Sequence, residues 1–187
     1  MELMDVIYTR RSARKYMDKE VDRCVVERLL DAAVQAPSAM NSQSWAFGVI
    51  QGKDKLREFS TPARMMMLKK IDESPEMEKY RELLSDPNFN IFYDAPVLVI
   101  IYAKPTVGLL SVINCSLAAQ NLMLAAKDGG LATCWIGFCA DYFHQDEVKR
   151  ELGVPLEFGV VAAIVVGYQS EEPPAREKNA PEILFWK

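Results

Sequence analysis

A run of cations close to the start of the chain is the first feature able to carry chemistry. Residues 10–16 read Arg-Arg-Ser-Ala-Arg-Lys-Tyr, which places four cations and a serine hydroxyl within six residues. Clustered positive charges repel one another unless an anion lies among them, and the planar fork of arginine suits a phosphate. The segment therefore predicts an anion site, although a solvated basic turn has the same composition.

Two further segments carry groups suited to a flat ligand. Residues 36–45 read Ala-Pro-Ser-Ala-Met-Asn-Ser-Gln-Ser-Trp, and their amides can both donate and accept hydrogen bonds, as the edge of a heterocycle requires. Residues 129–138 read Gly-Gly-Leu-Ala-Thr-Cys-Trp-Ile-Gly-Phe, where glycines let the backbone approach a planar molecule. Each pattern also fits an ordinary loop, the first between a helix and a strand, the second after a helix C-terminus.

Several other chemistries lack the residues that they need. His144 is the single histidine, which excludes a His₃ or Cys₂His₂ zinc site within one chain. The amphipathic pattern around it favours a place on a helix surface over a catalytic one. The chain also lacks the glycine-rich nucleotide loops and the Gly-x-Ser-x-Gly elbow of serine hydrolases. No metal site is expected.

Composition and charge narrow the partners and the location. The 187 residues carry 26 acidic and 22 basic side chains, a formal net charge of −4. Nucleic-acid-binding domains normally carry a basic excess, so no nucleic-acid partner is expected. The apolar run at residues 95–103 is far shorter than the ~20 residues of a membrane span, and the acidic N-terminus does not resemble a signal peptide. Because the four cysteines lack secreted-domain spacing, we expect reduced thiols and a cytoplasmic protein without a membrane partner.

Hydrophobic patterning predicts an α+β fold with about four strands. Strands are expected at residues 45–51, 96–103, 133–136 and 159–168. Helices are expected at residues 2–9, from an N-cap at Asp22 to Pro37, at 54–60, from an N-cap at Thr61 to about Leu84 with an interruption near Ser74, and at 108–128 and 142–152. Since no linker divides the chain, residues 1–187 are expected to form one domain.

Two apolar surfaces favour a homodimer. The helix at 108–128 is apolar nearly all round, more than one face of a sheet can cover. The segment Ile183–Trp186 adds an apolar end without evident cover. A second copy of the chain would bury both.

The polar and glycine-rich segments, in this order and at this spacing, resemble the nitroreductase family of flavin enzymes. The resemblance covers nearly the whole chain and is carried by residues 10–14, 36–45, 118–126, 130–137 and 167–176. It implies FMN as cofactor and NADH or NADPH as reductant. It also implies an α+β homodimer whose central sheet is mixed, mostly antiparallel and flanked by helices.

The resemblance assigns residues to both ends of the cofactor. Some would grip the phosphate and ribityl chain, with two bases from the C-terminal part assisting. Another cation would lie at the pyrimidine side of the ring, where it favours the negative charge that reduction produces. A loop of the partner subunit would cover the ring, and a backbone segment would approach N5. The residues at the phosphate and ribityl chain would be Arg10, Arg11 and Ser12, and the two assisting bases Arg176 and Lys178. The cation at the pyrimidine side would be Arg14. The covering loop would contribute Pro37, Ser38, Ala39 and Asn41, and the segment near N5 would be Ile136 and Gly137.

Three positions depart from the pattern of the family. Ser44 replaces a proline, Asn114 stands where an acid is common, and Ala132 replaces a frequent glycine. Residues 60–90 correspond to the most variable part of the family and are expected to shape the substrate channel. Within them, Met65–Met67 could line that channel or fill the core.

The resemblance implies an oxidoreductase with a ping-pong mechanism. NAD(P)H would pass a hydride to flavin N5 and leave, and a nitroaromatic, quinone or similar small acceptor would then take its place. The flavin carries the chemistry, so no catalytic side chain is expected. Two alternatives remain open: a related flavin reaction such as dehalogenation, flavin destruction or azoline oxidation, or a flavin-binding, storage or sensing protein without turnover.

Overall fold

The sheet at the centre of the structure is four-stranded and antiparallel. The computed structural model describes residues 1–187. The strands run in the order β1-β2-β4-β3, and every neighbouring pair is antiparallel. Their bounds are Trp45–Gln51 (β1), Val97–Ala103 (β2), Ala132–Trp135 (β3) and Gly159–Gly167 (β4). All four bounds lie within one residue of the predicted ranges, so the strand predictions are confirmed.

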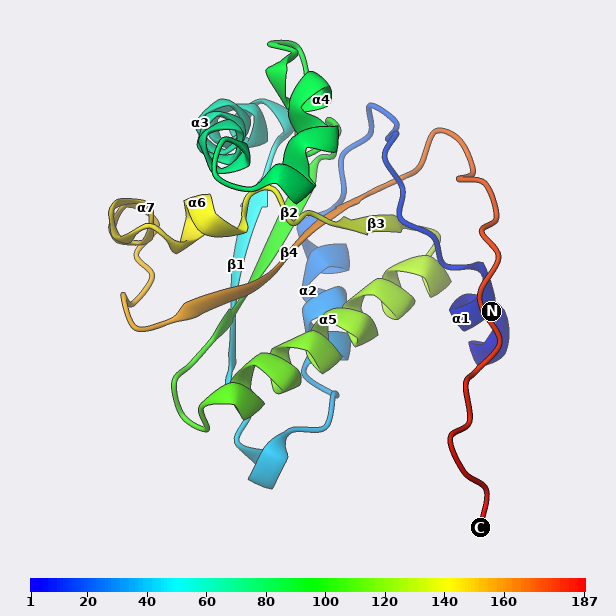
Figure 1. The fold of residues 1–187 in the computed structure, drawn as a ribbon. Helices are drawn as coiled ribbons and strands as arrows, with labels where there is room; N and C mark the ends of the chain where they lie inside the picture. The colour runs from blue at the N-terminus through cyan, green and yellow to red at the C-terminus, as the bar shows by residue number, and fades with distance from the viewer.

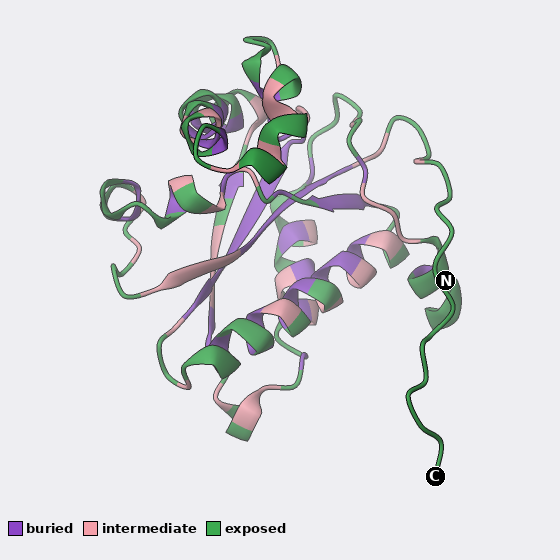
Figure 2. Cartoon of the chain, viewed as in Figure 1, coloured by how far each residue is buried: buried purple, intermediate pink, exposed green.

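Strand β2 divides the interior into two cores because it is buried on both faces. Every residue of β2 is buried. Successive side chains of a strand point to opposite faces. Val97, Val99 and Ile101 accordingly belong to one hydrophobic cluster, and Leu98 and Ile100 belong to the other. The sheet is the shared wall of both cores, which Figure 2 shows as a buried band between partly exposed helices.

Helices cover both faces of the sheet (Figure 1). On one face α2 (Arg23–Ala33) packs against α5 (Leu109–Asp128), and on the other lie α3 (Lys53–Ile71) and α6 (Ala140–His144). The remaining helices are α1 (Leu3–Thr9), the 3-10 helices η1 (Ala39–Asn41) and η2 (Pro75–Tyr80), α4 (Arg81–Ser85) and α7 (Asp146–Glu151). The α+β class with its mostly antiparallel sheet is confirmed, as are the helices predicted at 2–9, after Asp22 and at 108–128.

Helix α3 continues through Pro62, although the Thr61-Pro62 pattern predicts a break between two helices. Leu56, Phe59 and Ala63 recur at helical spacing and are buried. A proline inside a helix costs about 3 kcal/mol. Each fully buried large apolar side chain contributes about 1.5–3 kcal/mol, so the continuous buried stripe outweighs the proline. The interruption predicted near residue 74 is confirmed, because α3 ends at Ile71.

The single helix predicted over residues 142–152 is wrong. The chain forms α6 and α7, separated at Gln145, whose ψ of 138° is extended. Phe143 and Val148 are both buried. In one helix of 3.6 residues per turn these two side chains would point about 140° apart, whereas the break turns both toward the core. His144 is exposed at the end of α6, as predicted.

Helix α5, and not the run at 95–103, is the longest apolar segment of the chain. Its most apolar 18-residue window has a mean hydropathy of 1.5, which by length and composition is enough for a membrane span. In the structure α5 packs against α2 and the sheet, and it buries Cys115, Ala118 and Leu122 among others. The core helix of a globular domain passes the same test of length and hydropathy.

All four cysteines are free in the structure. Cys24 is exposed, whereas Cys115, Cys134 and Cys139 are buried. Burial also raises the pKa of the three buried thiols, that of Cys115 to about 11.

We therefore expect a disulfide reagent at pH 7.5 to titrate one thiol rapidly in the native protein and four after denaturation. The Cys24→Ser variant should lose the rapid phase, and a second rapid thiol in that variant would contradict the burial.

Candidate functional site

The N-terminal segment Arg10–Tyr16 runs along β3, an edge strand of the sheet. Ser12 forms a parallel bridge with Thr133, and the Ala13 N–H donates to the Thr133 carbonyl oxygen at 3.0 Å. Ala13 is completely buried, so a small side chain suits the point where the segment meets the sheet. The pairing satisfies backbone groups that an edge strand would otherwise expose. It also carries the predicted arginines to one border of the sheet.

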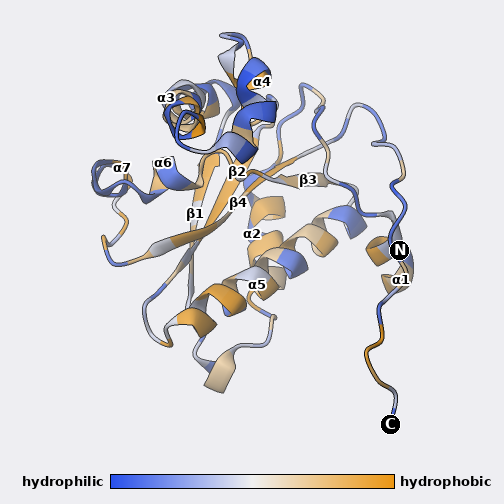
Figure 3. Ribbon diagram, viewed as in Figure 1, coloured by the Kyte–Doolittle hydropathy of each residue, from blue (hydrophilic) through white to orange (hydrophobic).

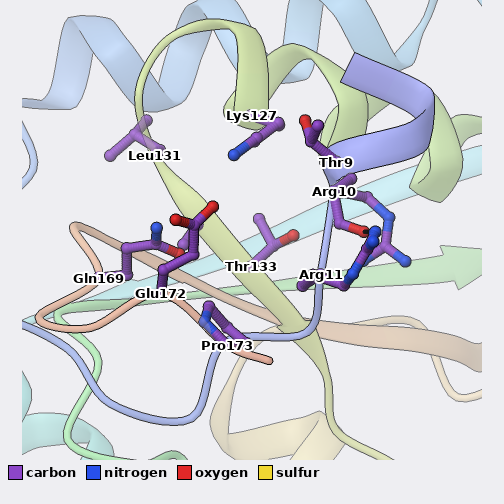
Figure 4. Close-up of a pocket in the computed structure, with 10 residues that line it drawn as sticks. Thr9, Arg10, Arg11, Lys127, Leu131, Thr133, Gln169, Glu172 and Pro173 are labelled. Carbon is purple, nitrogen blue, oxygen red and sulfur yellow. Dashed lines mark hydrogen bonds between the residues drawn. The ribbon is translucent and has the colours of Figure 1, made fainter. Parts of the chain in front are cut away.

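A small pocket at the start of β3 gathers positive charge (Figure 4). We name it the anion pocket, and its lining includes Arg10, Arg11, Lys127, Thr133, Gln169 and Glu172. Three cations face one carboxylate, which leaves the lining net positive. Arg11 also donates to the carbonyl oxygens of Tyr8 at 2.7 Å and Arg10 at 2.9 Å, and these bonds hold its guanidinium at the pocket wall. Cationic N–H donors in this number suit a phosphate or a similar anion.

No sequence motif identifies Lys127 or Gln169 as residues of the anion pocket. Lys127 lies in the last turn of α5, where a cation ordinarily complements the helix C-terminus. Gln169 follows β4 and joins the pocket because its backbone bridges to Tyr16. Only the pairing of distant segments reveals that both residues face the arginines.

A larger cavity follows the anion pocket along β3. We name it the aromatic cleft, and its volume of about 640 Å³ lies within the range of ligand sites. Tyr80 and Phe138 meet edge to face in its wall, with ring centroids 5.2 Å apart. Its lining also includes Arg14, Tyr93, Trp135 and Gly137, and Arg14 is the one charged residue. Large rings with little charge suit a flat aromatic ligand.

The backbone that follows β3 and lines the aromatic cleft has one N–H that the chain does not use. The Ile136 N–H donates to the Ala163 carbonyl oxygen at 2.7 Å and is therefore used within the sheet. The Gly137 N–H, in contrast, has no acceptor within the chain. A Cβ at Gly137 would meet no atom within 4 Å, so the space beside it is open. Of the two predicted residues, Gly137 alone has an N–H without an acceptor in the chain.

The ionisable groups nearest Arg14 stay neutral around pH 7. Burial raises the pKa of the Cys134 thiol, and Arg14 offsets only part of that rise. Burial likewise raises the pKa of the Tyr16 and Tyr93 phenols. A raised pKa keeps each of these acids protonated to a higher pH than usual. The positive charge of Arg14 therefore has no anionic neighbour.

The loop at residues 37–43 is tied to the first half of α5. Asn114 accepts the Ala39 N–H at its Oδ1, 3.1 Å away. Its Nδ2 donates to the hydroxyls of Ser42 at 3.1 Å and Ser44 at 2.9 Å. Asn114 is 2% exposed, its bond to Ser44 is buried, and its bonds to Ala39 and Ser42 are partly buried, so one side chain fixes the loop to the helix.

The same loop lies far from the arginines within one chain. Asn114 precedes Lys127 by 13 residues of α5, which is about 20 Å at 1.5 Å per residue. Figure 1 shows η1 near the start of α5, whereas residues 10–16 pass its other end. The structure therefore gathers Arg10, Arg11, Ser12, Arg14, Ile136 and Gly137 at β3 but leaves Pro37, Ser38, Ala39 and Asn41 at a second location.

The two predicted bases of the C-terminal part lie outside the anion pocket. Pro173 is the last residue of that segment in the lining, and Arg176 and Lys178 follow it in an exposed stretch. Neither makes an ion pair or a side-chain hydrogen bond within the chain. They lie three and five residues beyond Pro173.

The fold is α+β, and β3 borders both a small pocket lined by cations and a larger cavity lined by aromatic rings. The model of the nitroreductase family matches residues 7–168, and the chain belongs to this family. That match confirms the family resemblance seen in the sequence.

Individual relatives span nearly the whole chain. A protein of Methanothermobacter thermautotrophicus, whose name includes NADH dehydrogenase/NAD(P)H nitroreductase, is 30% identical over 98% of this chain and 86% of its own length. The nitrobenzene nitroreductase of Ectopseudomonas oleovorans is 29% identical over 96% of this chain and 92% of its own. A crystal structure of a nitroreductase with bound FMN from Bacteroides fragilis is 28% identical, covers 100% of this chain and 98% of its own, and has a TM-score of 0.82.

Replacing Asn114 tests the anchor of the 37–43 loop. The Asn114→Ala variant leaves the Ala39 N–H and two hydroxyls without partners, and an unsatisfied buried group costs about 1–3 kcal/mol. We expect its free energy of unfolding to fall by about 2–4 kcal/mol in urea denaturation. In Asn114→Asp the carboxylate can accept from all three groups, so this variant should lose less. Equal losses in both variants would contradict the role of these hydrogen bonds.

Proposed function

We propose that the chain is an FMN-dependent oxidoreductase that passes a hydride from NAD(P)H to a nitroaromatic, a quinone or a similar small acceptor. Membership of the nitroreductase family supports an oxidoreductase. FMN in the Bacteroides fragilis structure and NAD(P)H in the name of the archaeal relative support the cofactor and the reductant. The observation that carries the proposal is the succession of anion pocket and aromatic cleft along β3.

The residues at β3 fit FMN from end to end. Arg10, Arg11 and Lys127 supply cationic donors for the phosphate, and Ser12 adds a hydroxyl beside them. At the other end the aromatic cleft presents Arg14 and the unused N–H of Gly137. A fixed cation at the ring edge stabilises negative charge that develops there without reorganising at the moment of reaction. FMN when bound supplies the hydride acceptor and donor, N5.

The walls of the aromatic cleft position substrates and exclude water. Met77, Tyr80 and Leu83 line it from the segment between α3 and β2, which supports residues 60–90 as the part that shapes the substrate channel. Of the methionine run, Met67 is buried in the core and also reaches the cleft, whereas Met65 lines a separate surface groove. NAD(P)H and acceptor would occupy this one cleft in turn, which is a ping-pong mechanism.

A homodimer would complete the site. The 37–43 loop cannot reach residues 10–14 of its own chain across about 20 Å, so the loop of a second copy is proposed to cover the ring. Figure 3 shows hydrophobic residues at the start of α5 and near the end of the tail. The apolar side chains left exposed there are Leu109, Leu110, Ile113, Leu117, Ile183, Leu184, Phe185 and Trp186.

The proposal also includes the expectations about the domain, the C-terminal bases, the location and the partners. Residues 1–187 act as one domain, Arg176 and Lys178 add bases to the phosphate end, and the protein works in the cytoplasm on small molecules. Dilution-resolved light scattering tests the dimer, since a stable monomer that retains flavin would contradict it.

The double variant Arg10→Ala/Arg14→Ala tests the cofactor site. Each charge-assisted bond contributes about 1.5–3 kcal/mol, so losing two should weaken FMN binding about a hundredfold or more. We expect folded, colourless protein, measured as the flavin-to-protein absorbance ratio after gel filtration, with circular dichroism as the check on folding. Arg23→Ala, which removes an exposed arginine paired with Glu27, is the matched control and should stay yellow. Undiminished flavin in the double variant would place the cofactor elsewhere.

Mixed dimers test whether two chains share one site. Chains carrying Arg10→Ala/Arg14→Ala are co-expressed with chains carrying Ser38→Asp, which sets a negative charge on the ring-covering loop. If the loop acts on the other chain, a mixed dimer holds one intact site and one doubly altered site, so half the flavin returns. If each chain builds its own site, the mixed dimer stays colourless, and that result would refute the shared site.

A further inference from the structure

Arg14 is held in the aromatic cleft by an aromatic ring and by no carboxylate. Its guanidinium carbon lies 5.9 Å from the centroid of the Tyr93 ring, within the range of a cation–π contact. No acidic residue lines the cleft, and the groups that act on the Arg14 charge are Tyr93, Tyr16 and Cys134. The cation therefore has a fixed neighbour that carries no charge.

The kind of neighbour matters for what Arg14 can do. A carboxylate would orient the guanidinium but would also neutralise it and occupy its N–H donors. An aromatic face orients the cation from one side and leaves the charge and the in-plane donors available to a ligand. Arg14 is thus oriented without being neutralised.

Tyr93 reaches this place through a strained turn. Tyr93 and Asp94 have φ of 55° and 56°, two consecutive left-handed residues that are not glycine. The turn is closed by the Tyr93 N–H, which donates to the Asn90 carbonyl oxygen at 2.8 Å, and by Asn90 Nδ2, which donates to Asp94 at 2.9 Å. Arg57 pairs with Asp94 at 2.9 Å, and Phe92 is completely buried. Surrounding contacts hold the strained conformation, as is common at functional sites.

The orientation of the Tyr93 ring is also fixed. Phe89 meets it edge to face, with centroids 5.8 Å apart and planes at 71°. The ring is therefore clamped between Phe89 and Arg14, and both line the same cleft. The strained backbone at Tyr93 and the contact with Phe89 together hold the Tyr93 ring against Arg14.

We propose that Tyr93 is a positioning residue that holds Arg14 uncompensated at the ring edge of the cofactor, and so strengthens FMN binding and raises the midpoint potential of the bound flavin. The proposal rests on the proposed function, since it concerns the same site. Tyr93 acts through Arg14 by its ring face and by the hydrogen bond between its hydroxyl and the guanidinium. The Tyr93→Phe variant, which keeps the ring face, should therefore retain most of the effect, and Tyr93→Leu should lose it.

A double-mutant cycle on FMN affinity and midpoint potential tests this coupling. Tyr93→Leu should weaken FMN binding about fivefold, the size of an exposed cation–π contact, and should lower the midpoint potential. In the Arg14→Met background the same substitution should change the dissociation constant by less than about 1.5-fold. Tyr93→Phe should stay within about twofold of the parent. Equal losses with and without Arg14, or a loss in Tyr93→Phe as large as in Tyr93→Leu, would overturn the proposal.

A control separates coupling from lost stability. Lys19 lies over the Tyr168 ring at 3.8 Å, a second cation–π pair outside the cleft. The Tyr168→Leu variant removes a ring of the same size, and its effect on FMN affinity should be the same with Arg14 and with Met at that position. Coupling of Tyr168 to Arg14 as large as that of Tyr93 would show that general destabilisation, and not the contact, produces the signal.

A measurement on the protein without cofactor distinguishes failure of this proposal from failure of the proposed function. Burial raises the pKa of the Tyr93 phenol, and the hydrogen bond from Arg14 together with the Arg14 charge lowers it and offsets part of that rise. Ultraviolet titration of the tyrosines, with Tyr93→Phe to identify the signal, should show Tyr93 ionising at higher pH in Arg14→Met. An unmoved titration would overturn the Arg14–Tyr93 contact whether or not the wild-type protein binds FMN.

Discussion

The pairing of residues 10–16 with β3 is the interaction on which the rest of the site depends. The bond from the Ala13 N–H to the Thr133 carbonyl oxygen joins segments 120 residues apart in sequence. It sets Arg10 and Arg11 against the start of β3 and Arg14 against its end. A short edge strand is therefore both the border of the sheet and the axis of the site, and one backbone register aligns the anion pocket with the aromatic cleft.

The aromatic cleft carries a net positive charge because no carboxylate lines it. The chain is acidic overall, with a net charge of −4, yet the aromatic cleft contains one cation and no carboxylate. Burial keeps Cys134 and the nearby phenols neutral, so the charge of Arg14 is not cancelled locally. A positively charged cleft without carboxylates favours ligands that gain electrons, because a fixed cation stabilises the negative charge that they acquire.

Helix α5 has two functions that its sequence alone does not separate. Its buried face forms the core with α2 and the sheet, while its first half anchors the 37–43 loop and its last turn supplies Lys127 to the anion pocket. The rigid helix keeps Asn114 and Lys127, 13 residues apart, at a separation of about 20 Å. This fixed length is why the proposed site requires a second chain.

The strands, the long helix and the segments of the candidate site were predictable from the sequence, because apolar runs and residue order are local signals. Tertiary structure decided the rest. Burial of a continuous stripe carried α3 through Pro62, and the need to bury both Phe143 and Val148 broke the helix at Gln145. Lys127 and Tyr93 face the predicted arginines only because distant segments pack together, and no local pattern encodes a contact between residues so far apart in the chain.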